Sequence, residues 1–205
     1  MDFQALATQE SIEKTSAALK EHNFELIQVK SKQDALAKIQ ELIPDGVSVM
    51  NGGSETLREI GYLDLVKSGE HKWSNLHDVI LAEPDPVKQG LLRRQSTISD
   101  FYLGSAHAIT ETGEILIASN SGSQLPHLAF TSPNVVLVVG AQKITPNLTE
   151  ALRRIEEYVV PLEDTRLRGV YGIGTTYAKT LILHKENPMF GRKVYVILVN
   201  EKLGF

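Results

Sequence analysis

Apolar and polar residues alternate along the first third of the chain in blocks that predict helices and strands in turn. Residues 8–22 place apolar side chains among charged ones, which predicts an amphipathic helix. Apolar runs at 24–29 and 47–50 predict strands, and a capping pattern of Ser and Asp opens a helix over 31–43. A glycine turn after the second strand then leads into a helical stretch at 54–60. The order is helix, strand, helix, strand, helix.

The rest of the chain predicts helices first and strands afterwards. Residues 62–100 lack clear strands and are expected to be helical, with one helix beginning near Asp85-Pro86, because proline is favoured in the first helical turn. An amphipathic helix is predicted over 149–159, and 161–171 is expected to be irregular. The expected strands in this part are 101–110, 114–119, 134–140, 179–184 and 193–200.

This alternation predicts a single α/β domain over residues 1–205, with a peripheral N-terminal helix within 1–22. The run NVVLVVG at 134–140 has apolar residues at both odd and even positions, as in a parallel strand that is covered on both faces. We therefore expect a three-layer fold, in which a mostly parallel open sheet carries helices on both faces. The apolar strand at 194–199 fits an internal position or pairing in a homo-oligomer. Ligands of such sheets bind beyond the carboxyl ends of the strands.

The composition excludes several classes of partner, cofactor and catalysis. The formal net charge of −4 gives no attraction to nucleic acid or anionic membranes, so neither is expected as a partner. The chain has no cysteine, which excludes thiolate catalysis and any iron–sulfur cluster or Cys-based zinc site held by this chain. No cofactor is expected to be held by the chain itself. No apolar stretch approaches the length of a membrane span, and we expect a cytoplasmic protein.

Three segments rich in glycine and hydroxyl residues follow or flank predicted strands. Glycine lets the backbone approach a ligand, and free amides at a helix start bind anions. The segments therefore predict a cradle for a small anionic metabolite, although each turn alone also meets the needs of an ordinary connection. The predicted substrate-binding residues are Asn51, Gly52, Gly53, Ser54, Ser119, Asn120, Ser121, Gly122, Ser123, Gly174, Thr175 and Thr176.

Sharper nucleotide and hydrolase motifs are absent. There is no GxxxxGK[ST], and the glycines at 169–174 form GxxGxG, which reverses the dinucleotide-binding fingerprint. No GxSxG elbow is present, which disfavours serine hydrolysis.

Glu111 is the candidate catalytic residue, because it lies in a tight turn between two apolar strands. A carboxylate there suits a nucleophile toward a thioester, a general base or an acceptor for a sugar hydroxyl. The alternative is a hairpin residue exposed to water.

Other polar residues give weaker expectations. His127, beside the 119–124 loop, is the histidine expected nearest a ligand. The spacing of His71 and His77 matches no standard metal site, so no metal is expected. Two arginine pairs are expected to differ: Arg166 and Arg168 to clamp an anion, and Arg153 and Arg154 to be solvated.

Two stretches, LGSAHAITETGEILIASNSGSQLPHLAF and NVVLVVGAQKITPNLTEALRRIEEYVVPLED, resemble the lactate-utilisation (LUD) domain family. The strongest matches are residues 110–113, 119–123 and 140–144. The resemblance implies an α/β fold like that of ribose-5-phosphate isomerase, glucosamine-6-phosphate deaminase and the coenzyme A transferases. In the transferases a glutamate forms an acyl–CoA anhydride, and Glu111 lies in a similar turn, although Thr112-Gly113 does not reproduce the transferase motif.

The resemblance also implies a function, since family members are linked to bacterial oxidation of L-lactate to pyruvate with iron–sulfur partner proteins. The leading hypothesis is a protein that binds a small organic anion and contributes to that oxidation. A second hypothesis is a free-standing transferase or isomerase acting on a CoA thioester or sugar phosphate, with Glu111 as nucleophile or base. A third is a non-catalytic binding or regulatory module, so whether the protein is an enzyme stays open.

Overall fold

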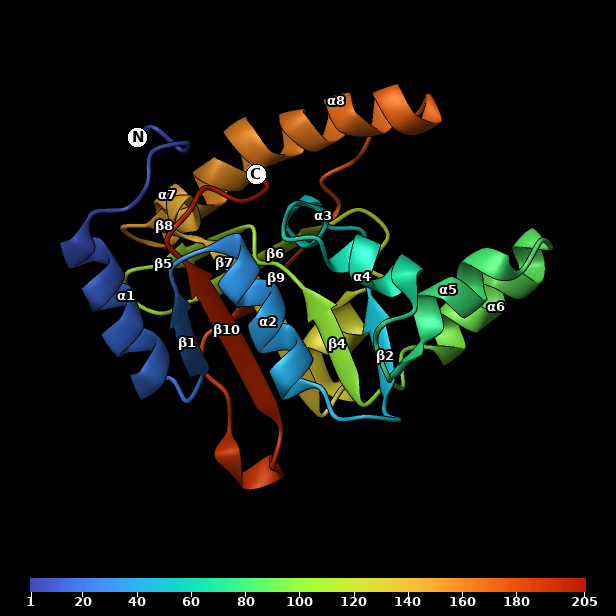
Figure 1. The fold of residues 1–205 in the computed structure, drawn as a ribbon. Helices are drawn as coiled ribbons and strands as arrows, with labels where there is room; N and C mark the ends of the chain where they lie inside the picture. Colours follow the sequence, from blue (N-terminus) through green and yellow to red (C-terminus); the bar gives the residue numbers. More distant parts are fainter.

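The computed structural model describes residues 1–205 and contains two β-sheets (Figure 1). The larger sheet is entirely parallel and has the order β1-β10-β7-β4-β2-β3. Its strands are β1 (Glu25–Val29), β2 (Ser48–Asn51), β3 (Ser74–Asn75), β4 (Phe101–Gly104), β7 (Asn134–Gly140) and β10 (Lys193–Val199). The smaller, mixed sheet has the order β8-β5-β6-β9. Its strands are β5 (Ala108–Thr110), β6 (Ile115–Ser119), β8 (Ile144–Thr145) and β9 (Lys179–Leu183).

The helices begin where the sequence offers capping side chains. Thr8 caps α1, Ser31 and Asp34 form the predicted capping box of α2, and Asp85 caps α6. The α-helices are α1 (Gln9–Glu21), α2 (Lys32–Leu42), α3 (Glu55–Glu59), α4 (Tyr62–Ser68), α5 (Leu76–Ala82), α6 (Pro86–Gln95), α7 (Leu148–Arg154) and α8 (Val160–Tyr171). Short helical turns are η1 (His127–Thr131), η2 (Ala141–Lys143), η3 (Ile155–Val159) and η4 (Pro188–Phe190). None of the helices combines the length and the apolar character that a membrane crossing needs.

The hydrophobic core is divided between the two faces of the larger sheet. On one face, α2, α3 and α4 pack against β2, β4, β7 and β10. The other face packs against α1 and the smaller sheet, whose far side is covered by α7 and η3. The α/β class and the parallel sheet with helices are thus confirmed, and the structure adds a second sheet between that sheet and the C-terminal helices. The strand β10 is internal, between β1 and β7.

Three expectations need correction. Residues 62–100 form helices α4, α5 and α6 as predicted but also contain the short edge strand β3, which pairs with β2. Residues 161–171 are not irregular but form α8, which Pro161 opens, Gly172 ends in the left-handed conformation, and ion pairs one turn apart support. The predicted strand 101–110 is two strands, because the chain leaves the larger sheet after Gly104 and enters the smaller sheet at Ala108.

The strand order creates a crevice at one place. From β2 the chain continues to the edge strand β3, whereas from β4 it continues in the opposite direction to β7. The connections therefore diverge between β2 and β4, and a parallel sheet binds its ligands beyond the carboxyl ends of the strands at such a point.

Candidate functional site

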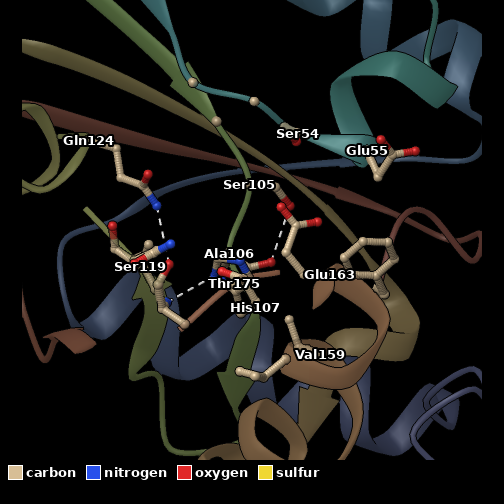
Figure 2. A pocket seen from close by; sticks show the side chains of 18 of the residues that line it. Ser54, Glu55, Ser105, Ala106, His107, Ser119, Gln124, Val159, Glu163 and Thr175 are labelled. Atoms are coloured by element: carbon tan, nitrogen blue, oxygen red, sulfur yellow. Dashed lines mark hydrogen bonds between the residues drawn. The ribbon is translucent and has the colours of Figure 1, made fainter. Parts of the chain in front are cut away.

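A cavity of about 260 Å³ lies at this divergence (Figure 2). Its walls come from the connections after β2, β4 and β6, from the loop after α8 and from α8 itself, and Phe205 also lines it. Ser119 and Gln124 lie on one side of the cavity, and Glu55 and Glu163 lie on the other. The predicted position of a ligand site, beyond the strand ends, therefore coincides with a real pocket.

The three predicted turns converge on this pocket. The predicted substrate-binding residues that line it are Gly52, Gly53, Ser54, Ser119, Asn120, Ser121, Thr175 and Thr176. Those that do not are Asn51, Gly122, Ser123 and Gly174. Gly122 has a φ of +85°, and its N–H donates to Ser119 Oγ (2.9 Å), so it shapes the loop that carries the lining residues. Ligand binding by these residues stays a prediction.

Glu111 lies outside the lining of the pocket. Its carboxylate accepts a hydrogen bond from Ser11 Oγ (2.6 Å) and lies 4.0 Å from the Lys14 ammonium, both on α1. The turn between antiparallel strands that the sequence predicted for Glu111 is present. Its catalytic role stays a prediction. In the structure its side chain contacts α1.

Lys143 is a residue of the pocket that the sequence analysis missed. Its side chain is buried at 2% exposure, although it lines the cavity. The ammonium donates to Thr56 Oγ1 (2.9 Å) and to Ser105 Oγ (3.0 Å). None of the ion pairs in the structure involves Lys143. The pocket thus contains a buried cation that is hydrogen-bonded to two hydroxyls and forms no ion pair.

This environment makes Lys143 a weak base. The pKa of Lys143 is lowered to about 7, first by burial and then by the positive charge of Arg154, while the negative charge of Glu59 acts in the opposite direction. At neutral pH the amine and the ammonium are therefore both populated. Ionisable groups with such shifted pKa values gather at functional sites.

His107 lies beside Lys143 in the same lining. Its Nδ1 accepts the Ala118 N–H (3.0 Å), so a neutral ring carries its proton on Nε2. Burial, followed by the charges of Lys143 and Arg154, lowers the pKa of His107 to about 3. The ring is neutral at physiological pH.

Arg154 is buried at 0% exposure, which corrects the expectation that it is solvated. Its Nη1 donates to the His107 carbonyl (2.5 Å), and its guanidinium stacks on the ring of Tyr158 (5.2 Å). Its Nε and Nη2 have no hydrogen-bond partner in the structure. The helical spacing alone did not distinguish Arg154 from the exposed Arg153.

The remaining candidates have defined places. His127 does not line the pocket; it stacks on Tyr102, which does, with 4.6 Å between the rings. Arg166 lines the pocket, but its guanidinium is paired with Glu163 (2.7 Å) and lies 3.6 Å from Glu55.

The remaining expectations concern Arg168 and metal binding. Arg168 pairs with Asp164 (2.6 Å) and lies outside the lining. No group of three His, Asp or Glu side chains converges in a way that could hold a metal ion.

Comparison with known proteins then places the chain. The LUD domain family matches residues 12–199. The chain belongs to the LUD domain family. The crystal structure of a DUF162 family protein from Deinococcus radiodurans shares the fold of this LUD domain at 12% sequence identity, with a TM-score of 0.59, covering 96% of this chain and 100% of that chain.

Ribose 5-phosphate isomerase A from Methanocaldococcus jannaschii aligns with this LUD domain at 14% identity and a TM-score of 0.39, covering 80% of this chain and 93% of that chain. No curated protein matches the chain.

Proposed function

We propose that this LUD domain binds a small organic anion beside Lys143 and contributes to the oxidation of L-lactate to pyruvate with iron–sulfur partner proteins. The observation that carries the anion site is the buried Lys143 ammonium, held by Thr56 and Ser105 without an acidic partner. The link to lactate is supported by family membership and the resemblance of residues 103–164 to lactate-utilisation proteins.

A bound anion would complete the environment of Lys143. An ammonium has three N–H donors, and two of them have acceptors in the protein. Burying a charge is costly unless it is paired, and hydrogen bonds between charged groups are stronger than neutral ones. A carboxylate that takes the third donor position would supply both the missing acceptor and the missing negative charge.

The wall of the pocket across from Ser119 and Gln124 favours a ligand with a single negative charge. Glu55 and Glu163 lie there, and Arg166 is committed to both carboxylates. A second anionic group placed against this wall would meet like charge at close range. The pocket therefore suits a small monocarboxylate better than a bisphosphate.

Electrons from lactate would need to leave through partners. The chain has no cysteine and so cannot ligate an iron–sulfur cluster by thiolates. In this proposal the LUD domain binds the organic anion, and the partner proteins hold the clusters.

Calorimetry with L-lactate, pyruvate, acetate and inorganic phosphate tests the anion site. We expect a carboxylate to bind the wild-type protein, and Lys143→Met to weaken binding by about 10- to 100-fold, because a hydrogen bond to a charged group contributes about 1.5–3 kcal/mol. Lys179→Met is the matched control, since Lys179 is exposed and its ammonium reaches only the Asn120 carbonyl (3.2 Å). Equal affinities in wild type and Lys143→Met would refute the site.

Growth on L-lactate tests the cellular role. Deletion of the gene should prevent growth in a host that depends on this system, and wild-type protein should restore it whereas Lys143→Met should not. Unchanged growth after deletion would remove the lactate assignment and leave the anion site to be judged by calorimetry.

A further inference from the structure

We infer that Lys143 is a nucleophilic amine that forms a reversible imine with the carbonyl carbon of a 2-oxo acid held in the pocket. This inference rests on the proposed anion site and specifies both its substrate class and the chemistry of its lysine. Three observations carry it: the hydrogen bonds of Nζ, the charges around it and the lining of the cavity.

The hydrogen bonds leave one tetrahedral position of Nζ without a protein partner. A neutral amine has two N–H bonds and one lone pair, and Thr56 Oγ1 and Ser105 Oγ accept the two N–H bonds. Both hydroxyls have their own acceptors, since Ser105 donates to the Ala106 carbonyl (3.1 Å) and Thr56 to the Leu203 carbonyl (3.4 Å). The two hydroxyls therefore act as acceptors toward Lys143, and the lone pair is the position that remains.

The surrounding charges favour the neutral, nucleophilic amine. Lys143 follows β7 in η2 and faces Arg154 of α7, which opposes protonation, and Glu59 of α3, which favours it. His107, on the connection between β4 and β5, is neutral and adds no charge. Desolvation and a neighbouring cation are the two means by which proteins turn a lysine into a nucleophile.

The same surroundings select a carbonyl compound that carries its own carboxylate. An imine that gains a proton places a positive charge on a nitrogen that forms no ion pair in the protein, since Glu59 acts on it only at longer range. In a 2-oxo acid the carboxylate is attached to the carbonyl carbon, so it lies next to that nitrogen and compensates the charge. Gly52, Gly53, Ser54, Ser119 and Ser121 also line the cavity, so the rest of such a ligand lies among glycine and serine residues.

The step balances without an oxidant or a reductant. The Nζ lone pair forms a bond to the carbonyl carbon, and the carbonyl oxygen becomes the hydroxyl of a carbinolamine. The carbonyl oxygen takes one amine proton to form this hydroxyl, and loss of the hydroxyl with the remaining amine proton, as one water molecule, leaves a C=N bond. Addition of water reverses the reaction.

Reductive trapping of the full-length protein tests the inference. Incubation with pyruvate and sodium cyanoborohydride should add the mass of one reduced adduct, and peptide mapping should place it on Lys143. Lys143→Met should lose the adduct, whereas Lys179→Met should keep it. Trapping on Lys143 should increase up to about pH 7 and then level off, whereas trapping on exposed lysines should increase toward their usual pKa of about 10.4.

Calorimetry in parallel separates this inference from the proposed function. If pyruvate and L-lactate both bind but no adduct forms at Lys143, the imine is refuted and the anion site stands. If neither ligand binds and no adduct forms, both proposals fail. An adduct spread equally over exposed lysines would also refute the inference, and because mapping uses the wild-type protein, the result does not depend on the folding of a variant.

Discussion

Lys143 and Glu111 are ionisable residues beside the same small sheet, and their surroundings differ in every respect that matters for chemistry. Lys143 is buried, lines the cavity and has hydroxyl partners only. The Glu111 side chain is 25% exposed, lies outside the cavity lining and has Ser11 and Lys14 as partners. The lysine forms no ion pair, whereas the glutamate has a donor and a nearby cation on α1. This difference is why we propose the reactive group at the strand ends and not at the hairpin turn.

Acid titration should have the largest effect on stability, because the pocket contains a buried base, His107, that stays unprotonated in the folded protein. The pKa of His107 is about 3 in the folded protein and about 6.5 in an unfolded chain, so below pH 6.5 the unfolded state binds more protons. Stability should therefore be lost as the pH falls from about 6.5 to about 3, by up to about 1.4 kcal/mol per pH unit from this residue.

His107→Gln isolates that contribution. Glutamine keeps a side-chain acceptor near the Ala118 N–H but has no proton to gain. Urea unfolding between pH 3 and pH 7 should show a shallower pH dependence in the variant. An equal pH dependence in the two proteins would show that the buried His107 ring does not cause the loss of stability in acid.

Thr56→Val tests how tightly the buried amine depends on its hydroxyl partners. The substitution keeps the side-chain shape but removes an acceptor of Lys143, which leaves a buried donor unsatisfied at a cost of about 1–3 kcal/mol. In the Lys143→Met background the same change should cost much less, because the donor is gone. Urea unfolding of the four proteins at pH 6 measures the coupling, and equal costs in both backgrounds would contradict it.

Arg154→Met tests the charge that surrounds the amine. Removing this buried cation should raise the pKa of Lys143, since Arg154 opposes its protonation. Arg153→Met is the control, because Arg153 is exposed and paired with Glu157. Titration of the isotope-labelled Lys143 side chain by NMR measures the pKa of Lys143 in each variant and in the wild type. A shift of equal size in the two variants would argue against a local effect of Arg154.

The fold was predictable where local signals agree with tertiary packing. The capping residues of α1, α2 and α6 and the fully apolar strand β7 are examples. The helix α8 was missed because none of its residues is fully buried and its sequence therefore shows no apolar stripe. The helix is stabilised by ion pairs and by Pro161 in its first turn. Such pairs are visible only once a helix is assumed.

The candidate site was predictable in part for a similar reason. Glycine and serine mark turns in the sequence, so the 52–54 and 119–121 connections were found. The importance of Lys143 depends on burial by residues such as Thr56, far away in the chain, and no spacing encodes that contact. One signal was available: Lys143 is the single charged residue between Ala141 and Ile144, shortly after a strand whose residues 135–139 are all apolar.

Glu111→Gln should have the smallest effect and tests the other side of the comparison. The amide can still accept the Ser11 hydrogen bond, and the Lys14 ammonium loses only the more distant of its two carboxylates (4.0 Å), since it keeps the ion pair with Glu10 (2.8 Å). The free energy of unfolding should change by no more than about 0.5 kcal/mol, as for most surface substitutions. Pyruvate binding and imine trapping at Lys143 should be unchanged, since the carboxylate lies outside the cavity lining. Loss of either in a normally folded Glu111→Gln protein would return the catalytic role to Glu111 and invert the comparison.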